Sequence, residues 1–220
     1  MHPLTLIIGN KNYSSWSLRP WLLLRQFSID FAEVKLPLDT PEFYARIGEY
    51  SPAGRVPVLR DGDVRVWDSL AIAEYANERF LHGRGWPIQV TARATARSVS
   101  AEMHSGFSAL RRELPMNCRK RVRGHAISAD AAADIVRIKA IWRDARNASN
   151  DGPGDFLFGS FGIADAMFAP VVLRFISYDV TLDAFERRYV ESIVALPTLQ
   201  EWLADAATEP LMPAREQLTP

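Results

Sequence analysis

Strand and helix signals alternate through the first third of the chain and then stop. The expected strands are 4–8, 31–35, 56–60 and 64–67, and the expected helices are 15–27, 41–50 and 69–80. The last two strands flank Asp61-Gly62, a dipeptide typical of a hairpin turn. This β-α-β-α-β-β-α order predicts a small α/β domain.

From Thr91 onward the chain is rich in alanine and arginine and shows helical periodicity with almost no strand signal. The expected helices are 91–114, 128–147, 163–177, 183–195 and 198–207. The segment from Gly83 to Pro87 is typical of a linker between the two halves. We therefore expect an α/β domain over residues 1–82 and an all-α domain over residues 88–220.

Composition argues against several classes of protein. The 220 residues carry 26 basic and 26 acidic side chains, and this zero net charge argues against a general nucleic-acid binder. The single cysteine, Cys118, excludes an intramolecular disulfide and fits a reducing compartment. The four histidines lack ligand-like spacing, so we expect no metal site. The apolar run 4–8 is too short for a signal sequence or a membrane span, so we expect a cytoplasmic protein.

The turn Tyr13-Ser14-Ser15-Trp16 joins the first expected strand to the first expected helix. A helix N-terminus presents unpaired N–H groups and a partial positive charge. A hydroxyl at that point can donate to a thiolate, which lowers the thiol pKa from its free value of about 8.5. Ser14 or Ser15 can equally well cap the helix and do nothing more, and on the turn alone capping is favoured.

Two later turns favour a ligand site. Val56-Pro57 precedes the third strand, where a cis proline would free the Val56 N–H and C=O for a peptide-like ligand; the alternative is an ordinary trans proline. Asp68-Ser69 opens the third helix, where the hydroxyl and helix N–H groups suit a carboxylate and the aspartate suits an ammonium. The alternative there is a simple N-cap pair.

Four segments carry a resemblance to a known superfamily. They are YSSWSLR at 13–19, SPAGRVPVL at 51–59, DSLAIAEY at 68–75 and FGIADA at 161–166. In these segments and their order, the chain resembles the cytosolic glutathione transferase superfamily over nearly its whole length. The resemblance implies a thioredoxin-like α/β N-terminal domain that binds glutathione, followed by an all-α C-terminal domain.

Within that superfamily the chain is most similar to the serine-containing, zeta-like branch, whose first turn carries Ser-Ser-Cys. Trp16 stands where that branch has cysteine. Gly162 stands where the superfamily has Ser or Thr in a buried helix cap, which leaves Asp165 as the expected buried carboxylate. We expect a weaker cap and an intact fold.

The resemblance assigns a role to individual residues of the turn 13–16, called the reactive turn from here on. Ser14 matches the thiol-activating serine, Ser15 is the fallback one position along, and Tyr13 is a third candidate because another branch uses tyrosine. Cys118 lies far along the chain in the helical half. We therefore interpret Cys118 as a bystander rather than a nucleophile.

The resemblance also assigns the glutathione-binding residues. Val56, followed by Pro57, matches the residue whose backbone pairs with the cysteinyl part of glutathione. Asp68 and Ser69 match the γ-glutamyl site. Trp16, beside the reactive turn, is expected to make the mouth of the pocket aromatic.

The second substrate is expected between the first turn and the helix 91–114. Met103, Phe107 and Leu110 lie on one face of that expected helix, where packing against the core is the favoured interpretation. His104 and Arg111 are seven positions apart and therefore roughly co-facial. They are candidates to contact a carboxylate of glutathione or of the second substrate.

The resemblance implies that the protein conjugates the thiolate of glutathione, its co-substrate, to a small electrophile without a metal. One alternative is glutathione-dependent cis–trans isomerisation of a maleyl acid, as in maleylacetoacetate isomerases. Another is a non-catalytic, glutathione-binding adaptor, because one fold hosts many functions. The resemblance also implies a homodimer and neither a nucleic-acid nor a membrane partner.

Overall fold

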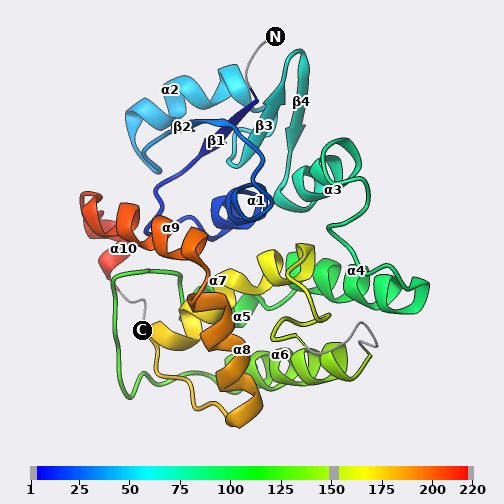
Figure 1. Ribbon diagram of the computed structural model, residues 1–220. Coiled ribbons are helices and arrows are strands. Elements are labelled where there is room, and N and C mark those ends of the chain that lie inside the picture. Colours follow the sequence, from blue (N-terminus) through cyan, green and yellow to red (C-terminus); the bar gives the residue numbers. More distant parts are fainter. Residues whose placement is uncertain (1–3, 149–153, 218–220) are drawn as a thin grey trace.

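A computed structural model describes residues 4–148 and 154–217, and it divides into the α/β and helical halves expected from the sequence (Figure 1). The first half contains β1 (Thr5–Ile8), α1 (Ser15–Gln26), β2 (Ala32–Lys35), α2 (Pro41–Tyr50), β3 (Val58–Asp61), β4 (Val64–Trp67) and α3 (Ser69–Arg79). All seven elements appear in the predicted order. The thioredoxin-like α/β class is therefore confirmed.

The four strands form one mixed sheet in the order β2-β1-β3-β4. β1 pairs in parallel with β2 and antiparallel with β3, and β3 and β4 form the predicted hairpin. Alternate β1 side chains point to opposite faces. Ile7 packs with Phe43 and Ile47 of α2 on one face, whereas Leu6 and Ile8 join the larger core with α1 and α3. The sheet thus lies between α2 on one side and α1 with α3 on the other (Figure 1).

The second half is helical. Its elements are α4 (Val90–Ser105), α5 (Ser108–Glu113), α6 (Ala129–Ala148), α7 (Ile163–Ser177), α8 (Ala184–Val194), α9 (Pro197–Thr208) and α10 (Pro213–Glu216). α7 is buried along almost its whole length and packs against α1 of the first half and α4 of the second. The large core is therefore shared by both halves.

The predicted helix over 91–114 is wrong as a single element. It breaks at Gly106 and at Phe107, whose φ of 60° is left-handed. The close approach of the Glu102 carbonyl, 2.9 Å from where a Gly106 Cβ would stand, leaves no room for a side chain. Phe107 is buried like Met103, so the expected packing role holds although the residues do not share one helical face. The short α10 was not predicted.

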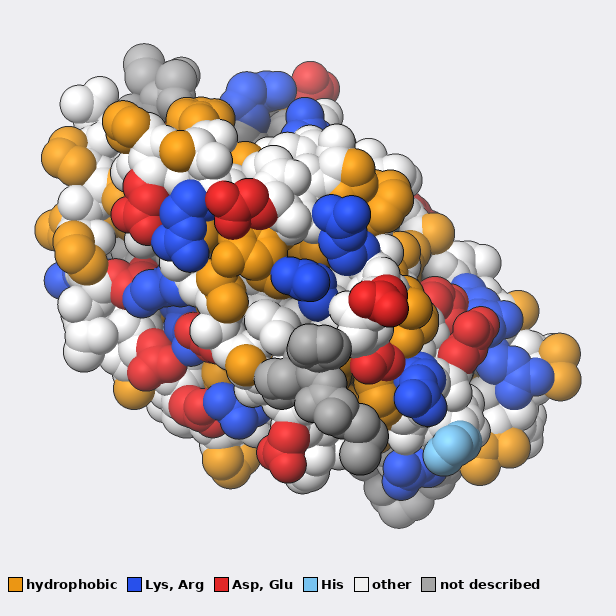
Figure 2. Space-filling model, turned by 90° about the horizontal axis from the view of Figure 1, so that it is seen from above, with side chains coloured by type: hydrophobic (Ala, Val, Ile, Leu, Met, Phe, Trp, Pro, Cys, Tyr) orange, Lys and Arg blue, Asp and Glu red, His pale blue; other side chains and the backbone are white. Residues whose placement is uncertain are grey.

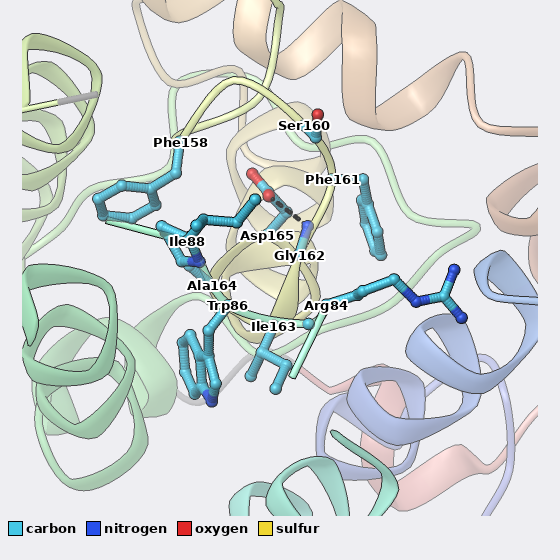
Figure 3. Close-up of a pocket in the computed structure, with 12 residues that line it drawn as sticks. Arg84, Trp86, Ile88, Phe158, Ser160, Phe161, Gly162, Ile163, Ala164 and Asp165 are labelled. Atoms are coloured by element: carbon cyan, nitrogen blue, oxygen red, sulfur yellow. Dashed lines mark hydrogen bonds between the residues drawn. The ribbon is translucent and has the colours of Figure 1, made fainter. Parts of the chain in front are cut away.

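The junction between the halves is packed. Trp86 is buried, and the Gly85 carbonyl accepts a hydrogen bond from the Ile163 N–H at 2.9 Å. This junction and the start of α7 line a cavity of about 370 Å³, in which the Arg84 side chain extends away from Asp165 (Figure 3).

Asp165 is the buried carboxylate that the sequence predicted. Its two oxygens accept the N–H groups of Leu157, at 3.0 Å, and of Gly162, at 2.9 Å. Gly162 has no hydroxyl to complete a capping box, and a Cβ there would stand 2.9 Å from the Gly85 carbonyl oxygen. Burial raises the pKa of Asp165 to about 6, although its hydrogen bonds to backbone N–H groups oppose that shift. Glycine at position 162 thus forgoes the capping hydroxyl and leaves room for the Gly85 carbonyl at the junction.

The segment after α9 returns to the first turn of the chain. The buried carboxylate of Glu209 accepts the backbone N–H groups of Lys11, at 2.9 Å, and of Asn12, at 3.1 Å. Further along, the Glu216 carboxylate accepts the Tyr13 hydroxyl. These contacts fix the loop between β1 and α1 from the helical side.

Charges of both signs are interspersed on the face of the molecule seen in Figure 2. Among residues 4–148 and 154–217, no helix is long and apolar enough to cross a membrane. Over the same residues, no cluster of three or more side chains is suited to hold a metal ion.

Candidate active site

Ser14 is the N-cap of α1. Its hydroxyl accepts the Ser17 backbone N–H at 3.4 Å and donates to the Ser17 hydroxyl at 2.7 Å. The Ser17 hydroxyl in turn accepts the Gly9 N–H at 3.1 Å. Ser14 therefore caps α1, as one of the two interpretations of the sequence expected. Ser14 also lines a cavity, so capping does not exclude a second role.

Ser15 has a different partner. Its buried hydroxyl accepts a hydrogen bond from Nη2 of Arg174 at 3.2 Å, and Arg174 also donates to the Leu114 carbonyl. Because a hydroxyl can accept and donate at once, the proton of Ser15 is left for another acceptor. Tyr13, the third candidate, is engaged elsewhere: its hydroxyl donates to Glu216 and accepts the Met212 N–H at 3.1 Å.

The peptide bond between Val56 and Pro57 is cis. Within the described part of the chain, the Val56 N–H and C=O make no hydrogen bond. Val56 lines both cavities of the candidate site. Its backbone is thus open to a peptide-like ligand.

Asp68 and Ser69 open α3. Asp68 adopts a φ of 81°, and its Oδ1 accepts the N–H groups of Leu70 at 2.8 Å and Ala71 at 3.3 Å. Oδ2 lies 3.1 Å from Nε2 of His104. The buried Ser69 hydroxyl is 3.4 Å from Nη1 of Arg19, which donates to it. One oxygen of Asp68 is thus committed to the helix, and the other contacts His104.

Two adjoining cavities bring these residues together. The larger, of about 630 Å³, is lined by Tyr13, Ser14, Ser15, Trp16, Val56, Arg111 and Arg174, among others. The smaller, of about 320 Å³, is lined by Trp16, Val56, Pro57, Asp68, Ser69 and His104, among others. Trp16, Arg55 and Val56 line both, so the reactive turn and the start of α3 open onto neighbouring spaces.

His104 and Arg111 lie on different helices, yet both reach Trp16. The His104 ring meets the Trp16 ring edge-on at 5.2 Å, and the Arg111 guanidinium lies 4.8 Å from the Trp16 ring centroid. Arg19 lies over the same ring at 4.3 Å. The expected convergence therefore occurs, although the expected helical spacing does not produce it.

Three arginines give the site a positive potential. Burial, and then repulsion from Arg111 and Arg174, lower the pKa of Arg19. Burial lowers the pKa of Arg174 to about 9, with Arg111 adding to the shift, and it also lowers the pKa of Arg111. None of the three forms a salt bridge within the described residues, and two nitrogens of Arg19 are buried without a partner there.

The sequence reasoning missed Arg19 and Arg174. Arg174 is the one polar residue of the apolar run 166–176 within α7, and a single charge in such a run is a signal that could have been read. Cys118 lines neither cavity. Burial raises the pKa of its thiol to about 12, so it carries almost no thiolate at neutral pH.

Two family models match successive parts of the chain. A glutathione S-transferase N-terminal domain matches residues 13–79, and a glutathione S-transferase C-terminal domain matches residues 88–205. The chain belongs to the glutathione S-transferase family. Glutathione S-transferases of known structure have the same fold. A Burkholderia glutathione transferase homologue with bound glutathione is 24% identical at a TM-score of 0.70, covering 94% of this chain and 100% of that one.

Other glutathione S-transferase relatives are more distant or match locally. A homologue from Lodderomyces elongisporus, with two glutathione molecules per subunit, is 14% identical at a TM-score of 0.68, covering 93% of this chain and 99% of that one. The dichloromethane dehalogenase of Methylorubrum extorquens is 38% identical over 63 residues. That match spans 28% of this chain and only 22% of the dehalogenase.

Proposed function

We propose that this glutathione S-transferase binds glutathione across the two adjoining cavities and transfers its thiolate to a small electrophile. Asp68 and Ser69 would take the γ-glutamyl ammonium and carboxylate, and the Val56 backbone would pair with the cysteinyl part. The observation that carries the proposal is the opening of these groups and the α1 N-terminus onto neighbouring cavities. A tripeptide held this way brings its sulfur to the reactive turn.

Thiolate stabilisation would come from hydrogen bonding and fixed positive charge. The N-terminus of α1 contributes a partial positive charge, and Arg111 and Arg174 line the same cavity. Charge in place before the reaction needs no reorganisation, so it favours the thiolate over the thiol. Holding the thiolate beside the electrophile adds the gain from proximity.

Ser14 is the proposed thiolate donor, which would place the protein in the serine-type, zeta-like branch. Ser15 is the fallback, supported by the bond from Arg174 that leaves its own proton free. The two serines differ in what else they do, because only Ser14 caps α1. A matched pair of variants can therefore separate catalysis from capping.

For Ser14→Ala, we expect the conjugation rate to fall about 100-fold, the usual loss for one donor to a reacting anion. Loss of the cap should also lower the free energy of unfolding by about 1 kcal/mol. Initial rates with 1-chloro-2,4-dinitrobenzene measure the first effect, and urea unfolding measures the second. Calorimetry checks that glutathione still binds. Wild-type turnover in Ser14→Ala with a large rate loss in Ser15→Ala would transfer the role to Ser15.

A crystal structure with glutathione gives the direct test. The donor hydroxyl should lie within about 3.2 Å of the sulfur. If calorimetry detects no glutathione binding, both the transferase proposal and the glutathione-binding adaptor fail. If it detects binding without turnover of any electrophile, the adaptor is the better description.

A second reaction is favoured by one observation. Arg111 and Arg174 line the larger cavity beside the reactive turn without forming a salt bridge in the described part of the chain. Guanidinium groups pair well with carboxylates, so an acidic second substrate would fit. Glutathione-dependent isomerisation of a maleyl acid is such a reaction. Incubation with maleylacetoacetate should then give isomerised product with no glutathione consumed, whereas a conjugate would exclude isomerisation.

We further propose that the chain forms a homodimer of two-domain subunits, with the domains at 1–82 and 88–220. The superfamily resemblance supports this assembly. Light scattering should give twice the mass of the chain, and a monomer mass would contradict it.

A further inference from the structure

His104, near the end of α4, contacts the carboxylate at the start of α3. Its Nε2 lies 3.1 Å from Oδ2 of Asp68, while Oδ1 is held by the first N–H groups of α3. His104 comes from the helical half and Asp68 from the α/β half. The contact therefore joins the two halves at the rim of the smaller cavity, which both residues line.

The other ring nitrogen fixes the protonation state of His104. Nδ1 is buried and has no partner among the described residues. A neutral ring leaves a bare lone pair there, whereas a protonated ring would bury an N–H without an acceptor, which costs more. The geometry therefore favours a neutral imidazole that donates from Nε2 to Asp68.

The charges around the ring act in the same direction. Burial lowers the pKa of His104, the Asp68 carboxylate opposes this, and Arg19 from α1 and Arg111 from α5 add to the lowering. Arg55 lines the same cavity, and Trp16 meets the ring edge-on. Asp68 is the one carboxylate that acts on the ring in the described part of the chain.

We propose that His104 is a positioning residue for amine recognition: neutral, it holds the Asp68 carboxylate toward the cavity, and protonated, it claims that carboxylate as an internal ion pair and weakens binding of a ligand ammonium. This inference rests on the proposed function, which gives Asp68 the α-amino group of glutathione. It adds a response to pH and a link between the two halves of the molecule.

The direction in which ligand affinity changes with pH follows from competition for one oxygen. The ligand ammonium and a protonated His104 are both cations that need Oδ2 of Asp68. Each therefore disfavours the other by the same factor, as linkage requires. Affinity should be full while His104 is neutral. It should fall at a pH lower than the ordinary histidine value of about 6.5, because burial and the nearby arginines lower the pKa of His104.

The test uses S-methylglutathione, which has no thiol and so removes thiol ionisation from the measurement. Calorimetry from pH 7.5 to pH 5 should show the affinity of the wild type falling about fivefold or more, a typical coupling between two sites. In His104→Gln, whose amide can still donate but cannot titrate in this range, the ratio of the two affinities should be close to one. His82→Asn, at an exposed position outside both cavities, should keep the wild-type ratio.

A second ligand isolates the ammonium. S-methylglutathione in which hydrogen replaces the α-amino group should bind more weakly and show no fall in acid. In NMR titrations of the wild type, S-methylglutathione should move the His104 midpoint to lower pH, and the deaminated ligand should not. Circular dichroism at each pH confirms that the fold is retained.

The outcomes separate the two proposals. Failure of the wild type to bind S-methylglutathione at pH 7.5 overturns the proposed function, and this inference with it. Binding with the same fall in acid for the wild type and His104→Gln overturns only the role of His104. A fall of equal size with the deaminated ligand also overturns it, because the ammonium is then not the competing cation.

Discussion

The two halves of the molecule contribute to the candidate site in different ways. The α/β half supplies turns and helix starts: Ser14, Val56, Asp68 and Ser69. The helical half supplies single basic side chains from separate helices: His104, Arg111 and Arg174. The first kind of group depends on local backbone geometry, and the second depends on how distant helices pack.

This difference extends to the two aspartates that lie at helix starts. Asp68 commits one oxygen to α3 and keeps the other for a partner across the cavity rim. Asp165 commits both oxygens to backbone N–H groups and is fully buried. The same residue type therefore keeps one oxygen available at a cavity in one half and commits both oxygens to the backbone in the other.

The largest expected effect separates these two aspartates. Asp165→Ala leaves the N–H groups of Leu157 and Gly162 buried without acceptors, so the free energy of unfolding should fall by about 3 kcal/mol. Asp68→Ala removes a half-exposed cap and should cost about 1 kcal/mol, but it should abolish tight glutathione binding. Urea unfolding and calorimetry measure both. Similar losses of stability in the two variants would break the contrast.

The pH dependence of Asp165 sharpens the same contrast. Its pKa of about 6 in the fold exceeds the unfolded value of about 4, so the folded state binds the proton more tightly. The advantage in stability of the wild type over Asp165→Ala should therefore shrink as the pH rises from about 4 to about 6. Urea titrations at several pH values check this, and a growing advantage would contradict it.

Arg174→Met tests whether the helical half supplies function rather than stability. The rate constant kcat/KM for conjugation should fall about 30-fold, because a cation beside the reactive turn is lost. Stability should change little, because the desolvation cost of a buried charge is removed while the hydrogen bonds to the Leu114 carbonyl and the Ser15 hydroxyl are lost. Rates and thermal unfolding give the two values. Arg187→Met, at an exposed position on α8, is the matched control; a large loss of stability with unchanged rate in Arg174→Met would make Arg174 structural.

Gly162→Ser restores the hydroxyl that the superfamily pattern expects, yet it should destabilise the protein by about 1 kcal/mol. The new Cβ would stand 2.9 Å from the Gly85 carbonyl oxygen, which is backbone. Gly48→Ser in α2 meets nothing within 4 Å and should be neutral or stabilising. Chemical denaturation compares the two variants. A gain in stability for Gly162→Ser would show that the Gly85 backbone can shift to accommodate the new side chain.

Cys118→Ala should have the smallest effect. The thiol lies outside both cavities, so conjugation rates should be unchanged. With a pKa of about 12, the thiol of the native wild type should resist an alkylating reagent at pH 7.5 and react only after unfolding. Loss of activity in Cys118→Ala would place chemistry in the helical half that the cavities do not indicate.

Much of the fold could be predicted from the sequence, because its signals are local. Strand and helix periodicity identified the seven elements of the α/β half, and the hairpin followed from Asp61-Gly62. The break after α4 was missed because periodicity continues through Phe107, whose left-handed backbone is set by packing. The four-residue α10 is too short to show a period.

In the candidate site, too, the residues in local turns could be predicted, whereas the contacts between the halves could not. Ser14, Val56 and Asp68 lie in recognisable turns, so their meeting at adjoining cavities followed from one motif order. The contact of His104 with Asp68 and that of Arg174 with Ser15 cross between the halves, and no local pattern encodes them. Sequence reasoning therefore named candidate ligand groups, His104 and Arg111 included, and missed Arg19, Arg174 and the contacts between the halves.

The bond from Glu209 to the loop after β1 has a consequence for the timing of synthesis. Glu209 and Lys11 are 198 positions apart, so the loop before α1 gains this anchor only after Glu209 has been translated. A chain still being made would carry the turn without its acceptors and with α1 uncovered by α7 and α9. Binding competence should therefore appear late and abruptly on the ribosome, and a chain cut before Glu209 should present an unfinished site to the proteases that remove incomplete products.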